Sequence, residues 1–215
     1  MGENAGVGWW RRNTWALLAL PVVLAIVVVS GLGRVLLFWL PHEFTDRVET
    51  TIGRAVTFTD DYTDVNGTHE RTVELSVLRV TPGAEPTTSA GETAVGEGLL
   101  PDGTQVWEVE LAVRADPETV LTGCVVALVD AEGRIAQRDT SLMTWDTAMS
   151  ACEPADTTNP SAILYDGFRS DPSTRPPTYT QSVQLLTADD FEPVEIRVWW
   201  EPPTYLAVPV PAVGR

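Results

Sequence analysis

The chain has 215 residues and a formal net charge of −16, which is unevenly distributed along it. The residues before His42 carry +2, from Arg11, Arg12 and Arg34 against Glu3, so the remainder carries −18. Such an acidic surface repels nucleic-acid phosphates and anionic headgroups, so we exclude nucleic acid as a partner. Its simplest role is to keep a domain soluble. The residues after the N-terminal segment, about 170, are enough for one domain with a real core.

All 14 basic residues are arginine, and the chain contains no lysine. It is also rich in alanine, valine, glycine, proline and threonine. This bias is typical of a genome with high GC content, and we expect an actinobacterial source. The inference concerns codon usage and says nothing about the fold.

Residues 15–40 form a long apolar segment that predicts a membrane-spanning helix. As a helix it would be about 39 Å long, against a hydrocarbon core of about 30 Å. The apolar region of a secretory signal is shorter, about 7–15 residues. The one passable cleavage site is Val29-Ser30-Gly31, and no cysteine follows the segment to accept a lipid. The segment therefore predicts a retained signal-anchor rather than a cleaved signal.

The residues that flank this segment predict its orientation. Arg11 and Arg12 precede it, so the positive-inside rule keeps residues 1–14 in the cytoplasm and exports the acidic domain. A twin-arginine export signal would prefer a hydrophobic pair where Asn13 and Thr14 follow. Aromatic and arginine side chains at both ends are suited to the membrane interfaces. The expected interface anchors are Trp9, Trp10, Arg11, Arg12, Trp15, Arg34 and Trp39.

Residues 41–51 are expected to be a short tether or a brief helix, and residues 52–215 an antiparallel β-sandwich of immunoglobulin type. Short apolar or alternating runs separated by glycine- and proline-rich turns are typical of this fold class. The two long gaps, 81–104 and 153–177, are expected to be loops. The expected strands are 52–59, 72–80, 105–115, 123–129, 134–138, 178–187 and 194–200.

Three of these runs predict which way their side chains face. In 105–115, alternation places Trp107, Val109, Leu111 and Val113 inward. Residues 123–129 are apolar on both faces, which predicts a central strand. In 194–200 the inward residues are Val194, Ile196, Val198 and Trp200, so Trp199 points outward.

The two cysteines, Cys124 and Cys152, predict a structural disulfide. Two cysteines in one exported domain usually pair, and a redox role would require a close C-x-x-C spacing that is absent. Closing this loop would stabilise the fold by about 3–4 kcal/mol in the chain-entropy model.

Three aromatic residues suggest an interaction surface. Trp199, Tyr205 and Trp145 are candidates for contact with a protein or for stacking on carbohydrate. The alternative is that Trp199 is covered by a loop or by the C-terminal tail. Residues 206–211 contain two prolines, which predicts an edge strand or a free segment.

Asp60, Asp61, Asp64 and Asn66 are the best candidates for a metal site, with Ca²⁺ as the ion, because calcium prefers several oxygen ligands on a tight loop. An EF-hand is excluded, because Tyr62 and Val73 would stand where carboxylates are required. The simpler interpretation is a turn between two strands, since Asn66-Gly67 is a strong hairpin signal.

The sequence contains no signature of catalysis. His69 is the realistic candidate for a general base, because the other histidine, His42, lies beside the membrane segment. There is no G-x-S-x-G motif, no H-E-x-x-H motif and no glycine-rich phosphate loop. We therefore predict that the protein is not an enzyme. An envelope hydrolase would become a candidate if acidic side chains and His69 converged in one pocket.

The order of strands and turns resembles the telokin-like, immunoglobulin-type domains of bacterial surface proteins of unknown function. Residues 107–111 lead through Asp116-Pro117-Glu118 to residues 126–130 and a turn at Gly133, and residues 196–203 end in two prolines. The resemblance covers about 100 residues of strand and turn patterning. It implies a sandwich and an extracytoplasmic location, and it transfers no catalytic residue.

These observations predict a single-pass protein of the cell membrane with a cytoplasmic N-terminus and an extracytoplasmic domain. The expected function is that of an interaction module or an accessory subunit of an envelope complex. Its partners would be the lipid bilayer and a membrane or envelope protein. The alternative is a ligand-binding or sensing domain that uses the tryptophans or the two long loops.

Overall fold

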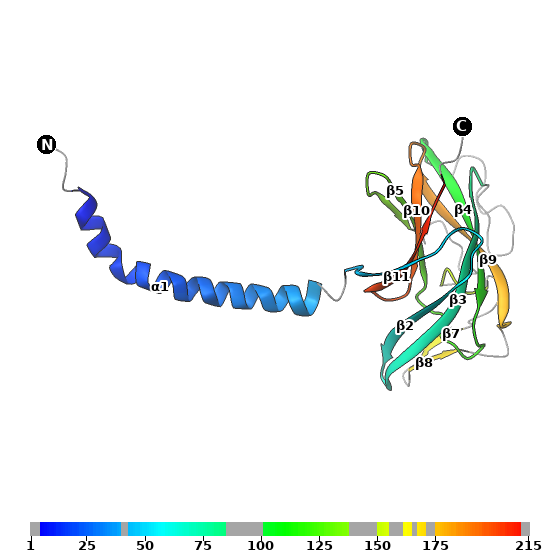
Figure 1. Cartoon of the computed structure of the whole chain (residues 1–215), viewed down its shortest axis with the longest axis horizontal. Helices are drawn as coiled ribbons and strands as arrows, with labels where there is room; N and C mark the ends of the chain where they lie inside the picture. Colours follow the sequence, from blue (N-terminus) through cyan, green and yellow to red (C-terminus); the bar gives the residue numbers. More distant parts are fainter. Residues whose placement is uncertain are drawn as a thin grey trace. The chain divides into compact units, whose positions relative to one another are not determined.

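The computed structural model divides the chain into two units, Met1–Glu43 and Phe44–Arg215, which are described separately. The first unit consists of the helix α1 (Ala5–Arg34) and the π-helical turn η1 (Val35–Trp39). The second unit contains the strands (Figure 1). The structure describes residues 5–39, 43–84, 101–137, 150–154, 161–164, 167–170 and 175–211.

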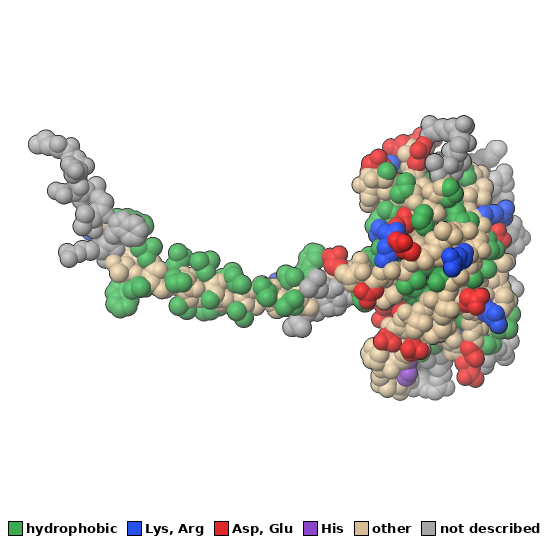
Figure 2. Space-filling model, in the orientation of Figure 1, with side chains coloured by type: hydrophobic (Ala, Val, Ile, Leu, Met, Phe, Trp, Pro, Cys, Tyr) green, Lys and Arg blue, Asp and Glu red, His purple; other side chains and the backbone are tan. Residues whose placement is uncertain are grey.

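Helix α1 is long and apolar enough to cross a membrane. Its stretch Arg12–Arg34 has 23 residues with a mean hydropathy of 2.6, and none of it is buried by protein. Hydrophobic side chains recur along the described part of this unit (Figure 2). Length and composition fit either a membrane anchor or an N-terminal signal sequence. The predicted interface anchors all lie in α1 except Trp39, which ends η1.

The second unit is a β-sandwich, which confirms the predicted fold class. Its five-stranded sheet has the order β1-β11-β10-β5-β6 and its four-stranded sheet the order β2-β3-β4-β9, while β7 and β8 form a separate hairpin. The first sheet contains β1 (Asp46–Glu49), β5 (Val125–Asp130), β6 (Ile135–Gln137), β10 (Pro193–Trp199) and β11 (Thr204–Pro209). The other strands are β2 (Val56–Asp64), β3 (Gly67–Pro82), β4 (Thr104–Arg114), β7 (Ser161–Leu164), β8 (Gly167–Ser170) and β9 (Thr178–Ala188).

The main core lies between the two sheets and follows the alternation of the strands. On β4, Trp107, Val109, Leu111 and Val113 are buried as predicted. They meet residues of the opposite sheet in one cluster, and each fully buried large side chain stabilises the fold by about 1.5–3 kcal/mol. The largest completely buried apolar side chains are Phe58, Leu75, Leu111, Leu121, Leu128, Leu185, Ile196 and Leu206.

Strand β5 is buried on both faces, as its sequence predicts. Val126 and Leu128 belong to the main core, whereas Ala127 belongs to a second cluster on the other face of the sheet. The strand lies between β10 and β6.

The cysteines form the predicted disulfide, Cys124–Cys152. Three further contacts hold the segment around Cys152. Ala151 N donates to Cys124 O, Ser150 Oγ donates to Leu121 O at 2.6 Å, and the hydroxyl of Tyr179 donates to Cys152 O at 2.7 Å. Residues 150–154 are therefore fixed to the core through one covalent bond and several hydrogen bonds.

Both ends of the sandwich differ from the sequence prediction. The tether predicted for residues 41–51 includes strand β1, which pairs in parallel with β11. The tail is consequently neither an edge strand nor a free segment, because β11 lies between β1 and β10. The inward orientation predicted for Val194 is also wrong, since this side chain is 45% exposed. The β10–β5 register shifts between Pro193 and Glu195, and this irregularity disrupts the simple alternation.

Candidate functional site: a groove beside the β2–β3 hairpin

A buried ion pair joins strands β2 and β3 below the candidate site. Arg71 Nε donates to Asp60 Oδ1 at 2.9 Å, and Arg71 Nη2 donates to Asp60 Oδ2 at 2.6 Å. Both side chains are almost completely buried. The two residues are direct neighbours in the antiparallel register, two positions along from the inward-facing pair Phe58 and Val73. Geometry of this kind, with two parallel N–H···O bonds, is the most favourable for a buried carboxylate.

Arg71 also connects the hairpin to two other parts of the sandwich. Its Nη1 donates to Val120 O at 3.3 Å, and its guanidinium carbon lies 4.7 Å from the centre of the Trp200 ring. Trp200 Nε1 in turn donates to Leu121 O at 2.9 Å. The hairpin, the loop after β4 and the end of β10 are thereby fixed to one another.

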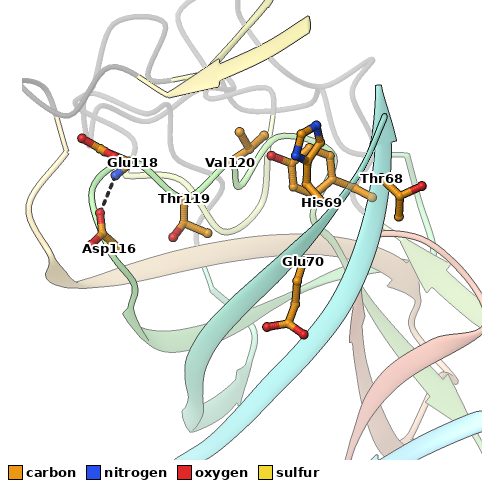
Figure 3. A pocket seen from close by; sticks show the side chains of 8 residues that line it. Thr68, His69, Glu70, Asp116, Glu118, Thr119 and Val120 are labelled. Carbon is orange, nitrogen blue, oxygen red and sulfur yellow. Dashed lines mark hydrogen bonds between the residues drawn. The ribbon is translucent and has the colours of Figure 1, made fainter. Parts of the chain in front are cut away.

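Above this network lies an open, polar groove of about 540 Å³. The hairpin provides one side and the loop between β4 and β5 the other (Figure 3). The groove is lined by Tyr62, Thr68, His69, Glu70, Asp116, Glu118, Thr119 and Val120.

The acidic side chains of the groove do not form a compact pair. Glu70 points away from the His69 ring (Figure 3). Asp116 Oδ1 accepts a hydrogen bond from Glu118 N at 2.9 Å, so the carboxylate of Asp116 stabilises the turn that begins at this residue. Behind the loop, the buried Arg175 donates through Nη2 to the carbonyl oxygens of Asp116, Pro117 and Thr119. These bonds hold the loop that forms one wall of the groove.

His69 makes structural contacts at the edge of the groove. Its Nε2 lies 3.1 Å from Asp64 Oδ1, and its ring centre lies 5.2 Å from that of Tyr62. The neighbouring Thr68 hydroxyl pairs with that of Thr63 at 3.1 Å. Within the described ranges, no serine, threonine or cysteine hydrogen-bonds to His69. The groove thus brings His69 and acidic residues together, and among the described residues that line it there is no activated nucleophile of the Ser–His or Cys–His type.

The structure does not bring the predicted calcium ligands together on one face of the hairpin. Asp60 is engaged by Arg71, and Asp61 lies on the opposite face of the same strand, beside Glu70. Asp64 Oδ1 accepts a hydrogen bond from Asn66 N at 2.8 Å, as expected of a hairpin turn. Among the described residues, no group of three or more His, Cys, Asp or Glu side chains could hold a metal.

The predicted interaction residues lie elsewhere, on the outer face of the five-stranded sheet. Trp199 faces away from the main core, as alternation predicts, but it is 7% exposed and Tyr205 is 6% exposed, so neither side chain is accessible. The ring of Phe44 lies edge-to-face on both, at 4.9 Å from Trp199 and 5.4 Å from Tyr205. The cover of Trp199 is therefore neither a loop nor the C-terminal tail, the two predicted alternatives, but the segment before β1. Trp145 lies outside the described residues.

Among the side chains of the sandwich whose pKa is shifted are Tyr179 and Asp130. Burial raises the pKa of Tyr179 to about 12, and the nearby Arg175 guanidinium partly opposes this rise. Burial by itself would raise the pKa of Asp130, but hydrogen bonds from the side chain and backbone of Arg134 outweigh it and lower the pKa overall. Neither residue lines the groove.

Comparisons with known proteins leave the function open. No protein-family model and no curated protein matches the chain. Among solved structures, it is similar to an uncharacterized β-sandwich protein from Clostridium difficile 630, with 11% identity and a TM-score of 0.40. The match covers 79% of this chain and 97% of the other. Similarity this low supports no transfer of function, and the resemblance to telokin-like domains stays a prediction.

Proposed function

We propose that the protein is a single-pass membrane protein whose sandwich is a non-enzymatic, extracytoplasmic interaction module. The observation that carries this proposal is the combination of the apolar stretch Arg12–Arg34 with a disulfide-bonded domain on one chain. Disulfides persist in oxidising compartments, which favours a location outside the cytoplasm. Arg11 and Arg12 before the span favour a cytoplasmic N-terminus. The resemblance to actinobacterial immunoglobulin-type surface domains agrees with this proposal.

The groove is the contact region that we propose for a partner. It lies open to solvent, its rim carries Glu70, Asp116 and Glu118, and its wall is held by hydrogen bonds to Arg71 and Arg175. A rigid, acidic, open surface is complementary to a cationic segment of a membrane or envelope protein. An accessory subunit of an envelope complex would use the sandwich and the spanning helix together.

A ligand-binding or sensing domain is the second candidate. A volume of about 540 Å³ falls within the range of small-molecule sites, about 300–1,000 Å³. Such sites are usually concave and mostly apolar, whereas this groove is open and polar. The geometry therefore favours a protein partner.

The test is gentle cross-linking of intact cells, followed by purification from detergent-solubilised membranes and mass spectrometry. The informative variant is Asp116→Asn with Glu118→Gln, because it removes two charges and an amide oxygen can still cap the turn. Its matched control is Glu132→Gln with Glu201→Gln, two exposed acids outside the groove. We expect one stoichiometric partner that the groove variant loses and the control retains. A partner retained by both variants would exclude the groove, and the absence of any partner would contradict the interaction module.

A further inference from the structure

We propose that residues 44–49, here called the strap, open as an independent unit and gate access to Trp199 and Tyr205. The strap consists of Phe44, Thr45 and strand β1. It follows the last helical residue, Trp39, after a link of four residues. A pull or rotation applied to the helix therefore reaches the strap before it reaches the rest of the sandwich.

The aromatic contact of the strap is separate from the main core. Phe44 packs against a small cluster formed by Ala127, Trp199, Tyr205 and Ala207, on the face of the sheet that does not meet β4. The main core is built from other residues, and within the strap Val48 is the apolar residue that packs against it. Removing the strap would thus uncover the small cluster, while the main core would lose only the contact of Val48.

Backbone contacts hold the strap along β11. Asp46, Arg47, Val48 and Glu49 pair in parallel with residues 204–207. Thr45 N and Asp46 N both donate to Pro203 O, at 3.2 and 3.1 Å. The strap contains a short strand at the edge of the sheet, with β11 as its neighbour. Local opening costs less free energy where few buried apolar contacts and solvent-exposed hydrogen bonds hold a segment.

A charged clip closes the strap beside the aromatic cluster. Arg47 Nη2 lies 2.7 Å from Glu195 Oε2, and Arg197 Nε donates to the other oxygen of Glu195 at 2.6 Å. The guanidinium carbon of Arg197 lies 5.2 Å from the centre of the Tyr205 ring. The Arg47 side chain is 39% exposed, so water can compete for this ion pair when the strap moves.

Opening the strap has a defined consequence for the surface. It removes the Phe44 ring from Trp199 and Tyr205, and it frees the edge of β11, whose residues Thr204–Pro209 carry no charge. The closed strap blocks that edge.

Hydrogen exchange measured by mass spectrometry on the full-length chain in detergent tests the strap. The variants are Phe44→Ala, the oxidised pair Asp46→Cys/Thr204→Cys that joins β1 to β11, and the control Val65→Ala at the exposed hairpin tip. We expect Phe44→Ala to speed exchange at least tenfold in residues 45–50 and in β11, with β4 unchanged. The cross-link should restore slow exchange when combined with Phe44→Ala, and the control should resemble the wild type.

Two results would overturn the proposal. Exchange that rises equally in β4 would show that the strap opens only when the whole sandwich unfolds. Exchange that does not change in residues 45–50 would show that Phe44 does not hold the strap closed.

Discussion

Arg71 and Asp60 form a two-point ion pair inside the sandwich, with Nε and Nη2 of the arginine 2.9 and 2.6 Å from the two carboxylate oxygens. This pair holds the β2–β3 hairpin in place, so the hairpin can form one wall of an open groove without a hydrophobic core of its own. Arg71 spans from the hairpin to Val120 and Trp200, so one side chain fixes three segments.

Breaking the Arg71–Asp60 ion pair should lower the stability of the fold substantially. Asp60→Ala leaves Arg71 buried without its carboxylate, and we expect a loss of about 3–5 kcal/mol in the free energy of unfolding. The matched control is Arg79→Ala, which breaks the exposed pair with Glu110 and should cost at most about 1 kcal/mol. Chemical denaturation of both variants measures the difference. Equal losses would contradict a special role for the buried pair.

The disulfide should contribute a large share of the stability. Cys124 and Cys152 are 28 positions apart, and opening a loop of this length should lower the free energy of unfolding by about 3–4 kcal/mol. Denaturation of the Cys124→Ala/Cys152→Ala variant, with and without reductant, measures the loss. The variant should be insensitive to reductant, and the wild type should lose its advantage on reduction. A wild type that reductant leaves unchanged would contradict this prediction.

Stability should fall in alkaline solution because of Tyr179. Its pKa is raised to about 12 in the folded state, above the value of 10.0 for an unperturbed tyrosine. Between these values the unfolded chain releases the proton and the folded chain retains it, so the folded state is favoured fully below pH 10 and progressively less up to pH 12. Tyr179→Phe should remove this part of the pH slope. It should also cost about 1 kcal/mol at neutral pH, because the bond to Cys152 O is lost. If the slope of stability against pH stayed unchanged in Tyr179→Phe, groups other than Tyr179 would cause the loss of stability in alkaline solution.

A fourth prediction concerns the stability of the fold in acidic solution. The pKa of Asp130 is lowered in the folded state, so the stability that its contacts with Arg134 provide is present above pH 3.8 and lost as the pH falls through the folded value. Asp130→Asn should therefore flatten the stability profile below pH 4. Thermal unfolding between pH 2 and pH 6 measures it. A variant with the wild-type acid profile would show that other carboxylates control that range.

Local patterns in the sequence predicted those features that depend on neighbouring residues. The alternation in β4 places Trp107 and Val109 in the core, and the two cysteines pair. The burial of β5 on both faces follows from its apolar run.

Contacts between distant segments could not be predicted in the same way. Alternation indicates that Trp199 faces away from the main core, but nothing near it in sequence shows that Phe44 covers it. The strand character of Asp46–Glu49 depends on pairing with β11, and its four polar and apolar residues carry no pattern of their own. The same holds for Asp60: its inward position two residues after Phe58 indicates that it needs a buried partner, but the sequence does not identify that partner as Arg71.

The proposed function requires that the apolar helix stays attached and anchors the sandwich. The intact mass of the protein, extracted from carbonate-washed membranes of its own cells, tests this requirement. We expect the 215 residues to be retained, at 23.4 kDa. A mature form shorter by about 30 residues, recovered from the soluble fraction, would show that the segment is a cleaved signal and would contradict the anchor.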